Sequence, residues 1–208
     1  MTNKVNLTQN APHFSALVTS ALCGIGLLVL SACSSAPARD ADTYYDMRPE
    51  MADITFQSDK RLKVQSVSVK GLQSGRSLVI EQATSPVQYQ EVRGHLWHVA
   101  PSTLIENAIS ETLMAASQDL QIGTSDTLDD EDMRLRIVVR KFHFTADQNA
   151  HLAFAAVLKD KRGKIISSTN YDITEPITEA GYQGAVLSLE KAMSQAIANL
   201  ASDIKDVL

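Results

Sequence analysis

The residue with the clearest chemical potential is Cys33, whose thiol directly follows a run of uncharged, mostly apolar residues. This run, from 16 to 30, consists mainly of Ala, Leu, Val, Ile and Gly, and Lys4 is the one Lys or Arg before it. A membrane-spanning helix needs about 20 consecutive apolar residues, whereas the apolar region of a signal peptide needs about 7 to 15 followed by small residues. The pattern therefore predicts a signal peptide over residues 1–32. An uncleaved anchor helix with an incidental cysteine is the alternative.

The residues around the predicted cleavage point, Leu30-Ser31-Ala32-Cys33, resemble the lipobox of bacterial lipoproteins. In that class the cysteine receives a diacylglyceryl thioether, the chain is cut before it, and its new amine is acylated. Burial of one acyl chain contributes about 0.8 kcal/mol per methylene and attaches a protein only marginally, so three chains should hold it durably. Because Cys23 would be lost with the signal, the mature chain would have no thiol left for a disulfide or a thiolate metal site.

Other residue types that could support catalysis do not follow a catalytic pattern. The stretch Gly71–Gly75 reads GLQSG, but a nucleophile elbow needs G-x-S-x-G between a strand and a helix, and Ser74 lies one position late. A zinc site needs three or four converging ligands, and a histidine base needs a nucleophile and an orienting acid. The spacing offers neither for the four histidines of the mature chain, His95, His98, His143 and His151. We therefore predict no enzyme activity, no catalytic or metal site and no cofactor, with a membrane-tethered hydrolase as the least favoured alternative.

Charge and length indicate which partners are expected and how the chain is divided into segments. The 208 residues include 19 basic and 24 acidic ones for a net charge of −5, and removal of Lys4 makes the mature chain one unit more negative. Nucleic-acid binding needs a basic face, so nucleic acid is not an expected partner. Residues 33–56 read as the lipidated N-terminus and a polar linker, and residues 57–208 as a single α+β periplasmic domain. A domain of this size buries roughly 70% of its unfolded surface, enough for one core.

Alternation of apolar and polar residues predicts strands in the stretches 61–71, 77–82, 86–92, 134–144, 151–158 and 164–173. The first stretch changes phase near Ser66, which predicts an irregularity there. In 134–144 the apolar phase shifts at Arg140 and Lys141, which predicts a β-bulge. Gly163 suits the tight turn between the last two strands, so the last three stretches should form an antiparallel meander.

Two segments show helical periodicity instead. Apolar residues recur at steps of three and four after Pro101, as far as Ala116, and again from Tyr182 to Ile204. Residues 124–133 are acidic but lack the glycine and the distal glutamate of an EF-hand loop, so we predict a solvated loop and no calcium site. Two amphipathic helices packed on one face of a mostly antiparallel sheet of about five or six strands give an α+β fold.

The order of these segments is similar to that of the ABC-type transport auxiliary lipoprotein family, whose familiar member is the paraquat-inducible protein C type of lipoprotein. The resemblance rests on several weak motifs in sequence order. They are the pair Tyr44-Tyr45 after the linker, VQSVSVKGL at 64–72, the block 77–113 with Trp97 shortly before Pro101, and the segments 134–144, 151–158 and 181–204.

The resemblance implies a non-enzymatic role beside an ABC transporter and a mammalian-cell-entry (MCE) domain substrate-binding protein. Such systems move lipids or other hydrophobic molecules between the two membranes of Gram-negative bacteria. Ser34 follows Cys33 in place of the aspartate that retains lipoproteins at the inner membrane, so we expect an outer-membrane anchor facing the periplasm. We expect a docking component, with a homo-oligomer left open as an assembly. The alternative is a carrier that holds a hydrophobic ligand in a groove between helix and sheet.

The candidate partner-binding residues are Tyr44, Tyr45, Leu72 and Trp97, together with an exposed sheet edge. Trp97 has two interpretations, because its ring could fill the core beside the first helix or could anchor an interface, where tryptophans are enriched. Lipidation at Cys33 is the modification on which the membrane attachment depends.

Overall fold

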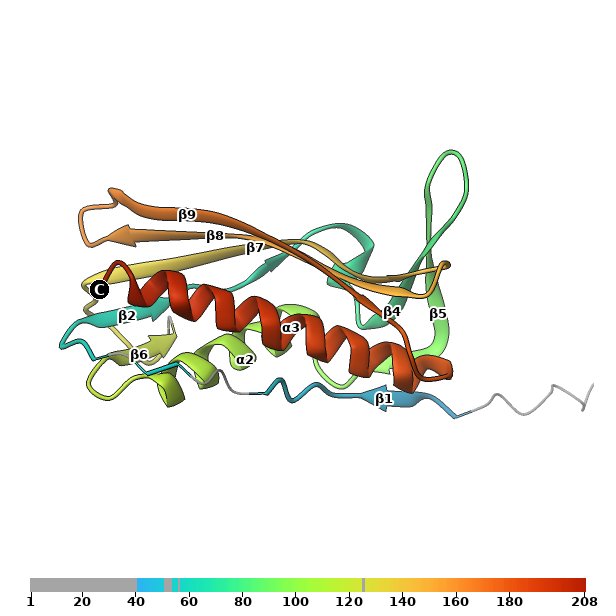
Figure 1. The fold of residues 1–208 in the computed structure, drawn as a ribbon, viewed down its shortest axis with the longest axis horizontal. Helices are drawn as coiled ribbons and strands as arrows, with labels where there is room; N and C mark the ends of the chain where they lie inside the picture. Colours follow the sequence, from blue (N-terminus) through green and yellow to red (C-terminus); the bar gives the residue numbers. More distant parts are fainter. Residues whose placement is uncertain (1–40, 51–53, 56, 125) are drawn as a thin grey trace, which may run out of the picture. The chain divides into compact units, whose positions relative to one another are not determined.

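The computed structural model describes residues 41–208 apart from 51–53, 56 and 125. The predicted signal peptide and Cys33 lie outside the described residues. Figure 1 shows the elements, which in chain order are β1 (Thr43–Tyr45), β2 (Arg61–Val64), β3 (Ser68–Val69), the 3₁₀ helix η1 (Gly71–Ser74), β4 (Ser77–Gln82), β5 (Gln88–Trp97), α2 (Pro101–Ala116), β6 (Gln121–Thr124), β7 (Met133–Thr145), β8 (Asn149–Asp160), β9 (Ile165–Pro176) and α3 (Gly181–Lys205).

The strands form one mixed nine-stranded sheet built around β7. On one side of β7 lie β8 and then β9, both antiparallel to their neighbours. On the other side, β2, β3 and β4 pair with successive parts of β7, all in parallel. The sheet continues from β2 to β6 and from β4 through β5 to β1. The α+β class is confirmed.

The prediction of a mostly antiparallel sheet of five or six strands is wrong, because five of the eight strand pairs are parallel. Periodicity reveals that a segment is extended but not which way its neighbour runs. The connection through α2 returns the chain so that β7 starts beside β2 in the same direction, as parallel pairing requires. The meander of β7, β8 and β9, which needs only tight turns, is as predicted.

Local irregularities also appear where the sequence pattern placed them. The register between β7 and β8 shifts between Val139 and Lys141, which confirms the β-bulge. The change of phase near Ser66 is the gap between β2 and β3. Gly163 has a φ of 83° in the turn between β8 and β9, a left-handed conformation that glycine adopts without steric cost.

Both helices lie on the same side of the sheet and contact each other there, which closes the core (Figure 1). The apolar stripe of α3 is buried throughout, as are the apolar side chains of α2 that face it and the sheet. Burial of one such side chain contributes about 1.5–3 kcal/mol, so the two stripes supply much of the stability. The core-forming residues of α3 include Val186, Leu189, Met193, Ile197, Leu200 and Ile204.

Part of the predicted linker belongs to the folded unit. Strand β1 pairs in parallel with β5, and Met47 is only 6% exposed. The backbone N–H of Arg48 donates a hydrogen bond of 2.7 Å to the Glu190 carboxylate on α3. The linker predicted over 33–56 is therefore too long at its C-terminal end, because a strand of three polar and aromatic residues has no detectable alternation. Residues 33–40 lie outside the described residues.

The acidic stretch before β7 is held by ion pairs, so the prediction of a solvated loop is wrong for its last residues. Glu131 is 8% exposed and pairs with Lys63 at 2.8 Å and with Arg134. Hydrogen bonds from the side chains of Lys63, which has the larger effect, and Arg134 lower the pKa of Glu131. Asp132 accepts a hydrogen bond from the backbone N–H of Arg61, and this contact and the Arg61 guanidinium lower the pKa of Asp132. These ion pairs connect the start of β7 to β2.

Candidate functional site

The candidate partner-binding residues outside the core lie on β1 and η1. Tyr44 is 54% exposed, and the guanidinium carbon of Arg76 lies 5.5 Å from its ring centroid, a cation–π arrangement. Tyr45 is half-buried, and its hydroxyl lies 2.8 Å from His95 Nδ1. Leu72 is 43% exposed on η1. Tyr44 and Leu72 are therefore available to a partner, whereas Tyr45 is engaged within the fold.

Trp97 is in the core. Its side chain is 2% exposed, and its ring centroid lies 5.1 Å from that of Phe142. The Trp97 backbone donates to the carbonyl oxygen of Arg76, and its own carbonyl accepts from Arg76 Nε at 3.0 Å. The core interpretation is confirmed. A partner cannot reach the ring in the folded chain, so its burial gives no support to the interface-anchor interpretation.

His143 lies at the centre of a buried polar network that spans β4, β7 and η1. Gln73 Oε1 accepts a hydrogen bond from the Phe142 backbone N–H at 3.0 Å, so Gln73 Nε2 must donate to His143 Nδ1, also at 3.0 Å. The ring proton is then on Nε2, which lies 3.0 Å from a Glu81 carboxylate oxygen without pointing directly at it. Burial lowers the pKa of His143 and so favours the neutral ring. The Glu81 carboxylate acts in the opposite direction, but its effect is smaller.

The stretch Gly71–Gly75 forms a turn between β3 and β4 that includes η1, and it is followed by the strand β4, not by the helix that a nucleophile elbow would need. The Ser74 hydroxyl donates a hydrogen bond of 2.8 Å to the Gly71 carbonyl, which is a contact within the turn. Gln73, 7% exposed, is the side chain that connects η1 to β7. Its partners lie about seventy positions further along the chain, so no local sequence signal marks it. His143 Nδ1 lies beside Gln73 and His143 Nε2 lies beside Glu81. The ring therefore connects β7 to η1 and to β4.

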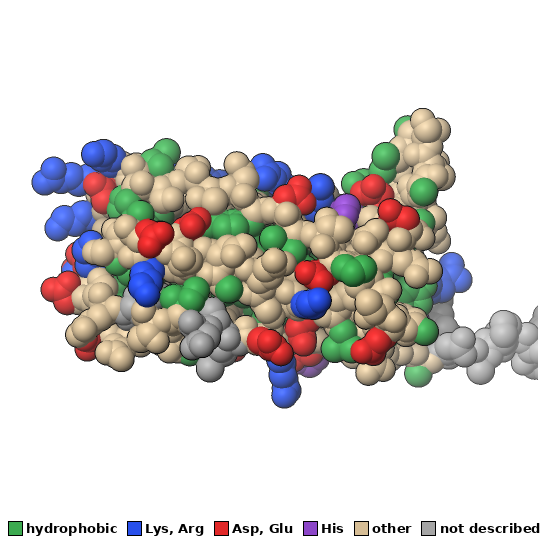
Figure 2. Space-filling model, viewed as in Figure 1, with side chains coloured by type: hydrophobic (Ala, Val, Ile, Leu, Met, Phe, Trp, Pro, Cys, Tyr) green, Lys and Arg blue, Asp and Glu red, His purple; other side chains and the backbone are tan. Residues whose placement is uncertain are grey.

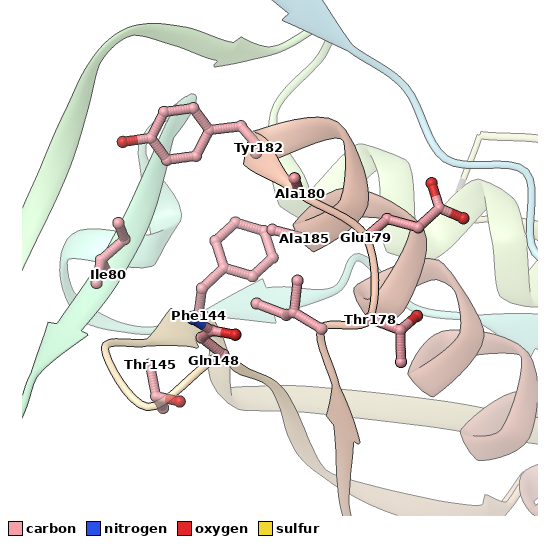
Figure 3. Close-up of a pocket in the computed structure, with 11 residues that line it drawn as sticks. Ile80, Phe144, Thr145, Gln148, Thr178, Glu179, Ala180, Tyr182 and Ala185 are labelled. Carbon is pink, nitrogen blue, oxygen red and sulfur yellow. The ribbon is translucent and has the colours of Figure 1, made fainter.

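A pocket of about 470 Å³ opens between β4, the end of β7 and the start of α3, and its lining combines apolar side chains with Thr145, Gln148, Thr178 and Glu179 (Figure 3). In Figure 3 the Phe144 ring lies between Ile80 and Ala185, and the Tyr182 ring lies beside them. The Glu179 carboxylate points away from Ile80 and Phe144. Ligand pockets typically enclose about 300–1,000 Å³ and are lined mainly by apolar and aromatic side chains. Size and lining therefore suit a small hydrophobic molecule or an acyl chain.

The segment between β9 and α3 shapes the mouth of this pocket. Its first residue, Ile177, donates its backbone N–H to the Gln148 carbonyl at 2.9 Å, and Ser188 Oγ donates to the Pro176 carbonyl at 3.0 Å. A Cβ on Gly184 would overlap the backbone of Glu179, so only glycine permits this close approach. The segment is thus held firmly over the first turns of α3. No sequence pattern predicted the pocket, because its walls come from three elements far apart in the chain.

One predicted residue is connected to the pocket wall. The Tyr182 ring, which lines the pocket, lies 4.2 Å from the His95 ring between centroids, and His95 hydrogen-bonds Tyr45. Burial raises the pKa of Tyr45, and the neighbouring Tyr182 adds to the effect, so the Tyr45 hydroxyl stays protonated as a hydrogen-bonding group. The aromatic cluster Tyr45–His95–Tyr182 therefore connects β1, where the chain enters the fold, to the pocket.

Two searches of the described residues were negative. His, Cys, Asp and Glu side chains there form no group of three or more that could hold a metal ion. No helix in the described part of the chain combines the length and the hydrophobicity that crossing a bilayer requires.

Comparisons with known proteins give a family and a shared fold. A family model described as "ABC-type transport auxiliary lipoprotein component" matches residues 46–205. No curated protein matches the chain. A crystal structure of an uncharacterised protein is similar with 21% identity and a TM-score of 0.69, covering 79% of this chain and 99% of its own. A crystal structure of a DUF330 protein from Xanthomonas campestris is similar with 16% identity and a TM-score of 0.71. The match covers 79% of this chain and 95% of the Xanthomonas chain. The PelC dodecamer from Paraburkholderia phytofirmans has 15% identity and a TM-score of 0.46. The match covers 76% of this chain and 95% of the PelC chain.

Proposed function

The chain belongs to the family of ABC-type transport auxiliary lipoprotein components, and we propose that it is the lipid-anchored docking subunit of such a transport system. The observation that carries the proposal is the family match over 46–205 in a chain whose N-terminal region carries a lipobox at Leu30–Cys33. Membership in a family of auxiliary components suggests a role in binding and positioning rather than catalysis. Acyl chains on Cys33 fix the protein to a membrane while the folded unit faces the periplasm.

The system that we propose is of the MCE type, with an ABC transporter at the inner membrane and an MCE-domain substrate-binding protein as the direct partner. Its cargo is a lipid or another hydrophobic molecule. Ser34 lacks the carboxylate of an inner-membrane retention signal, which supports the outer membrane as the site of the anchor. The auxiliary subunit would then receive the partner at the far side of the periplasm.

The surface best suited to docking is the free edge of β9. Strand β9 runs over twelve residues and pairs only with β8, so its other side has unpaired backbone groups within the described sheet. Among the other edge strands, β1 has three residues and β6 has four, too few for a stable pairing. An extended segment of a partner can add to such an edge through main-chain hydrogen bonds. We therefore assign β9 as the strand that receives the partner.

Site-specific photocrosslinking in cells tests this assignment. A photoreactive phenylalanine in place of the exposed Ser168 on β9 should crosslink to the MCE-domain protein or to a transporter subunit. The matched control replaces Met114, which is 49% exposed on α2, and should give no such product. Crosslinks to transport components from Met114 but not from Ser168, with both variants equally abundant, would show that docking uses another face.

A second candidate function is that of a carrier, which the pocket beside Tyr182 favours. If a hydrophobic molecule occupies it, native mass spectrometry of the purified lipoprotein should detect about one non-covalent ligand per chain. Ala185 lines the pocket, and Ala185→Phe should remove at least about nine-tenths of that ligand, since a full side chain in a pocket of this size displaces most of a bound chain. Leu187→Phe, on an exposed position of the same helix, is the control. Equal ligand content in the two variants, after thermal unfolding confirms that both are folded, excludes this pocket as the carrier site.

A further inference from the structure

The hairpin between β4 and β5 stands out from the body of the fold (Figure 1). The two strands pair in antiparallel fashion as far as Gln82 and Gln88, and the loop 83–87 closes the hairpin. Strand β4 meets β7 only at Ile80 and Glu81, so the outer part of the hairpin has no neighbour in the sheet. Every residue from 83 to 91 is exposed. Nothing in the folded unit requires this length of hairpin for its core.

The outer part of the hairpin carries no charged side chain. Charged residues make up 21% of the chain, yet the nine residues 82–90 include none. The exposed apolar groups near the end of the hairpin are Ala83, Pro86 and Val87, the last at 57% exposure, whereas the Tyr89 ring lies at the base, 5.3 Å from the His143 ring between centroids. In Figure 2 the projection carries hydrophobic and other uncharged side chains, and the nearest acidic side chains lie at its base. We name residues 82–90 the hairpin tip.

Backbone polar groups at the hairpin tip are partly satisfied within the tip itself. The Thr84 backbone N–H donates to the Gln82 carbonyl at 2.8 Å, and Thr84 Oγ1 donates to the Pro86 carbonyl at 2.9 Å. Pro86 brings no backbone N–H. Removing the tip from water therefore leaves fewer unpaired polar groups than an ordinary loop would, which lowers the cost of contact with an apolar surface.

The point where the chain enters the fold lies beside the strand that carries the hairpin tip. Thr43 aligns with His95 of β5 in parallel pairing, and an Asp42 carboxylate oxygen lies 3.8 Å from the position a Cβ would take on Gly94. The parallel pairing covers residues 43–45 and 95–97, and Gly94, with a φ of 74°, directly precedes it on β5. Cys33 precedes Asp42 by nine residues, which span about 30 Å at most. Seven residues of extended strand, the separation of Val87 from Gly94, span about 24 Å.

We propose that the hairpin tip rests on the surface of the bilayer that holds the lipid anchor, as a second and non-covalent membrane contact. The inference depends on the proposed anchor at Cys33, because the anchor keeps the membrane within reach of the hairpin tip. The apolar side chains of Ala83, Pro86 and Val87 suit the boundary between headgroups and acyl chains. An uncharged tip also avoids the repulsion that an anionic surface exerts on the mature chain, which is one unit more negative than the −5 of the full sequence.

The contact is weak on its own and becomes effective through the anchor. Two or three small apolar side chains do not hold a soluble protein to a membrane, but a tethered one meets the surface at a high local concentration. The consequence is orientation, because two points of contact limit how the folded unit turns about its tether. The turn between β8 and β9, with the cations Lys161, Arg162 and Lys164, lies at the opposite end of the sheet in Figure 1 and is then directed away from that membrane.

A single fluorescent label tests the proposal directly. The mature chain has no cysteine besides Cys33, whose sulfur the anchor blocks, so Val87→Cys introduces one reactive thiol for an environment-sensitive dye. The lipidated protein is reconstituted in vesicles of phosphatidylethanolamine and phosphatidylglycerol that contain nitroxide-labelled lipid. We expect at least threefold stronger quenching at residue 87 than at Ile165→Cys, which is 55% exposed at the start of β9. Emission at residue 87 should also shift to shorter wavelength.

A second variant and a flotation step distinguish loss of the hairpin contact from loss of the lipid anchor. With the dye on Ser85→Cys instead, Val87→Glu should reduce quenching to the level of the Ile165 control while the protein still floats with the vesicles. Flotation with equal quenching at both positions overturns the hairpin contact and leaves the anchor intact. Failure to float overturns both. A dye response at residue 87 only after addition of the solubilised transport partner, in detergent without vesicles, would instead identify the hairpin tip as a protein contact and would refute the lipid one.

Discussion

Replacement of Cys33 by serine should abolish incorporation of fatty acid and, because cleavage follows lipidation, should leave the apolar segment 16–30 on the chain. Serine is close to cysteine in size but cannot form the thioether, so all three acyl chains should be lost. In a variant whose residues 1–33 are replaced by a signal peptide that is cleaved without lipidation, about 0.8 kcal/mol per buried methylene is removed, and nearly all of the protein should move to the soluble periplasmic fraction. Metabolic labelling with a clickable fatty acid and fractionation of the cells measure both effects.

Cys23→Ser is the matched control for this experiment, because Cys23 is the other cysteine of the chain and lies within the predicted signal peptide. It should leave both labelling and membrane attachment unchanged. Persistent labelling of the Cys33 variant, or a loss of labelling in the Cys23 variant, would show that the lipidation site is elsewhere. Cys33 lies outside the described residues, so this assignment depends on the sequence and on the family alone.

Trp97→Ala should lower the free energy of unfolding by about 3–5 kcal/mol, the usual cost of truncating a buried aromatic side chain to alanine. The ring is 2% exposed and packs on Phe142, so its removal leaves a cavity between the end of β5 and β7. Its hydrogen bonds with Arg76 involve backbone groups of Trp97 and are retained. Urea denaturation of residues 34–208, produced without the signal peptide and the anchor, measures the loss.

Val87→Ala is the control for surface truncation, because Val87 is 57% exposed. A surface substitution of this kind changes stability by no more than about 0.5 kcal/mol. If Trp97→Ala and Val87→Ala have the same denaturation midpoint while only Trp97→Ala weakens the complex with the transport partner, the core assignment is contradicted. The interface-anchor interpretation of Trp97 would then be correct.

Elements whose evidence is local were predictable from the sequence. The stripe from Tyr182 to Ile204, the bulge near Arg140 and the turn at Gly163 each depend on residues within a few positions of one another, and each is present. The direction of strand pairing depends on where the chain returns after a long connection, so the parallel pairs of β7 were missed. Strand β1 was missed because three residues are too few to show alternation.

The functional features divide in the same way. The prediction of lipidation at Cys33 rests on four consecutive residues and needs no structure. The pocket needs Ile80, Phe144 and Tyr182 from three separate elements, and the network around His143 needs Gln73, so neither has a local signature. For Trp97 the sequence left two interpretations open, because the residue type suits both a core and an interface, and only burial decides between them.

The central claim, that the protein is the docking subunit of an ABC-type transport system, is tested most directly by affinity isolation of the lipidated chain from membranes in mild detergent. Mass spectrometry should recover an MCE-domain protein and ABC transporter subunits in amounts comparable to the chain itself, and crosslinking of intact cells before lysis should increase their yield. Recovery of the chain without any transport component, both with and without crosslinking, would contradict the account.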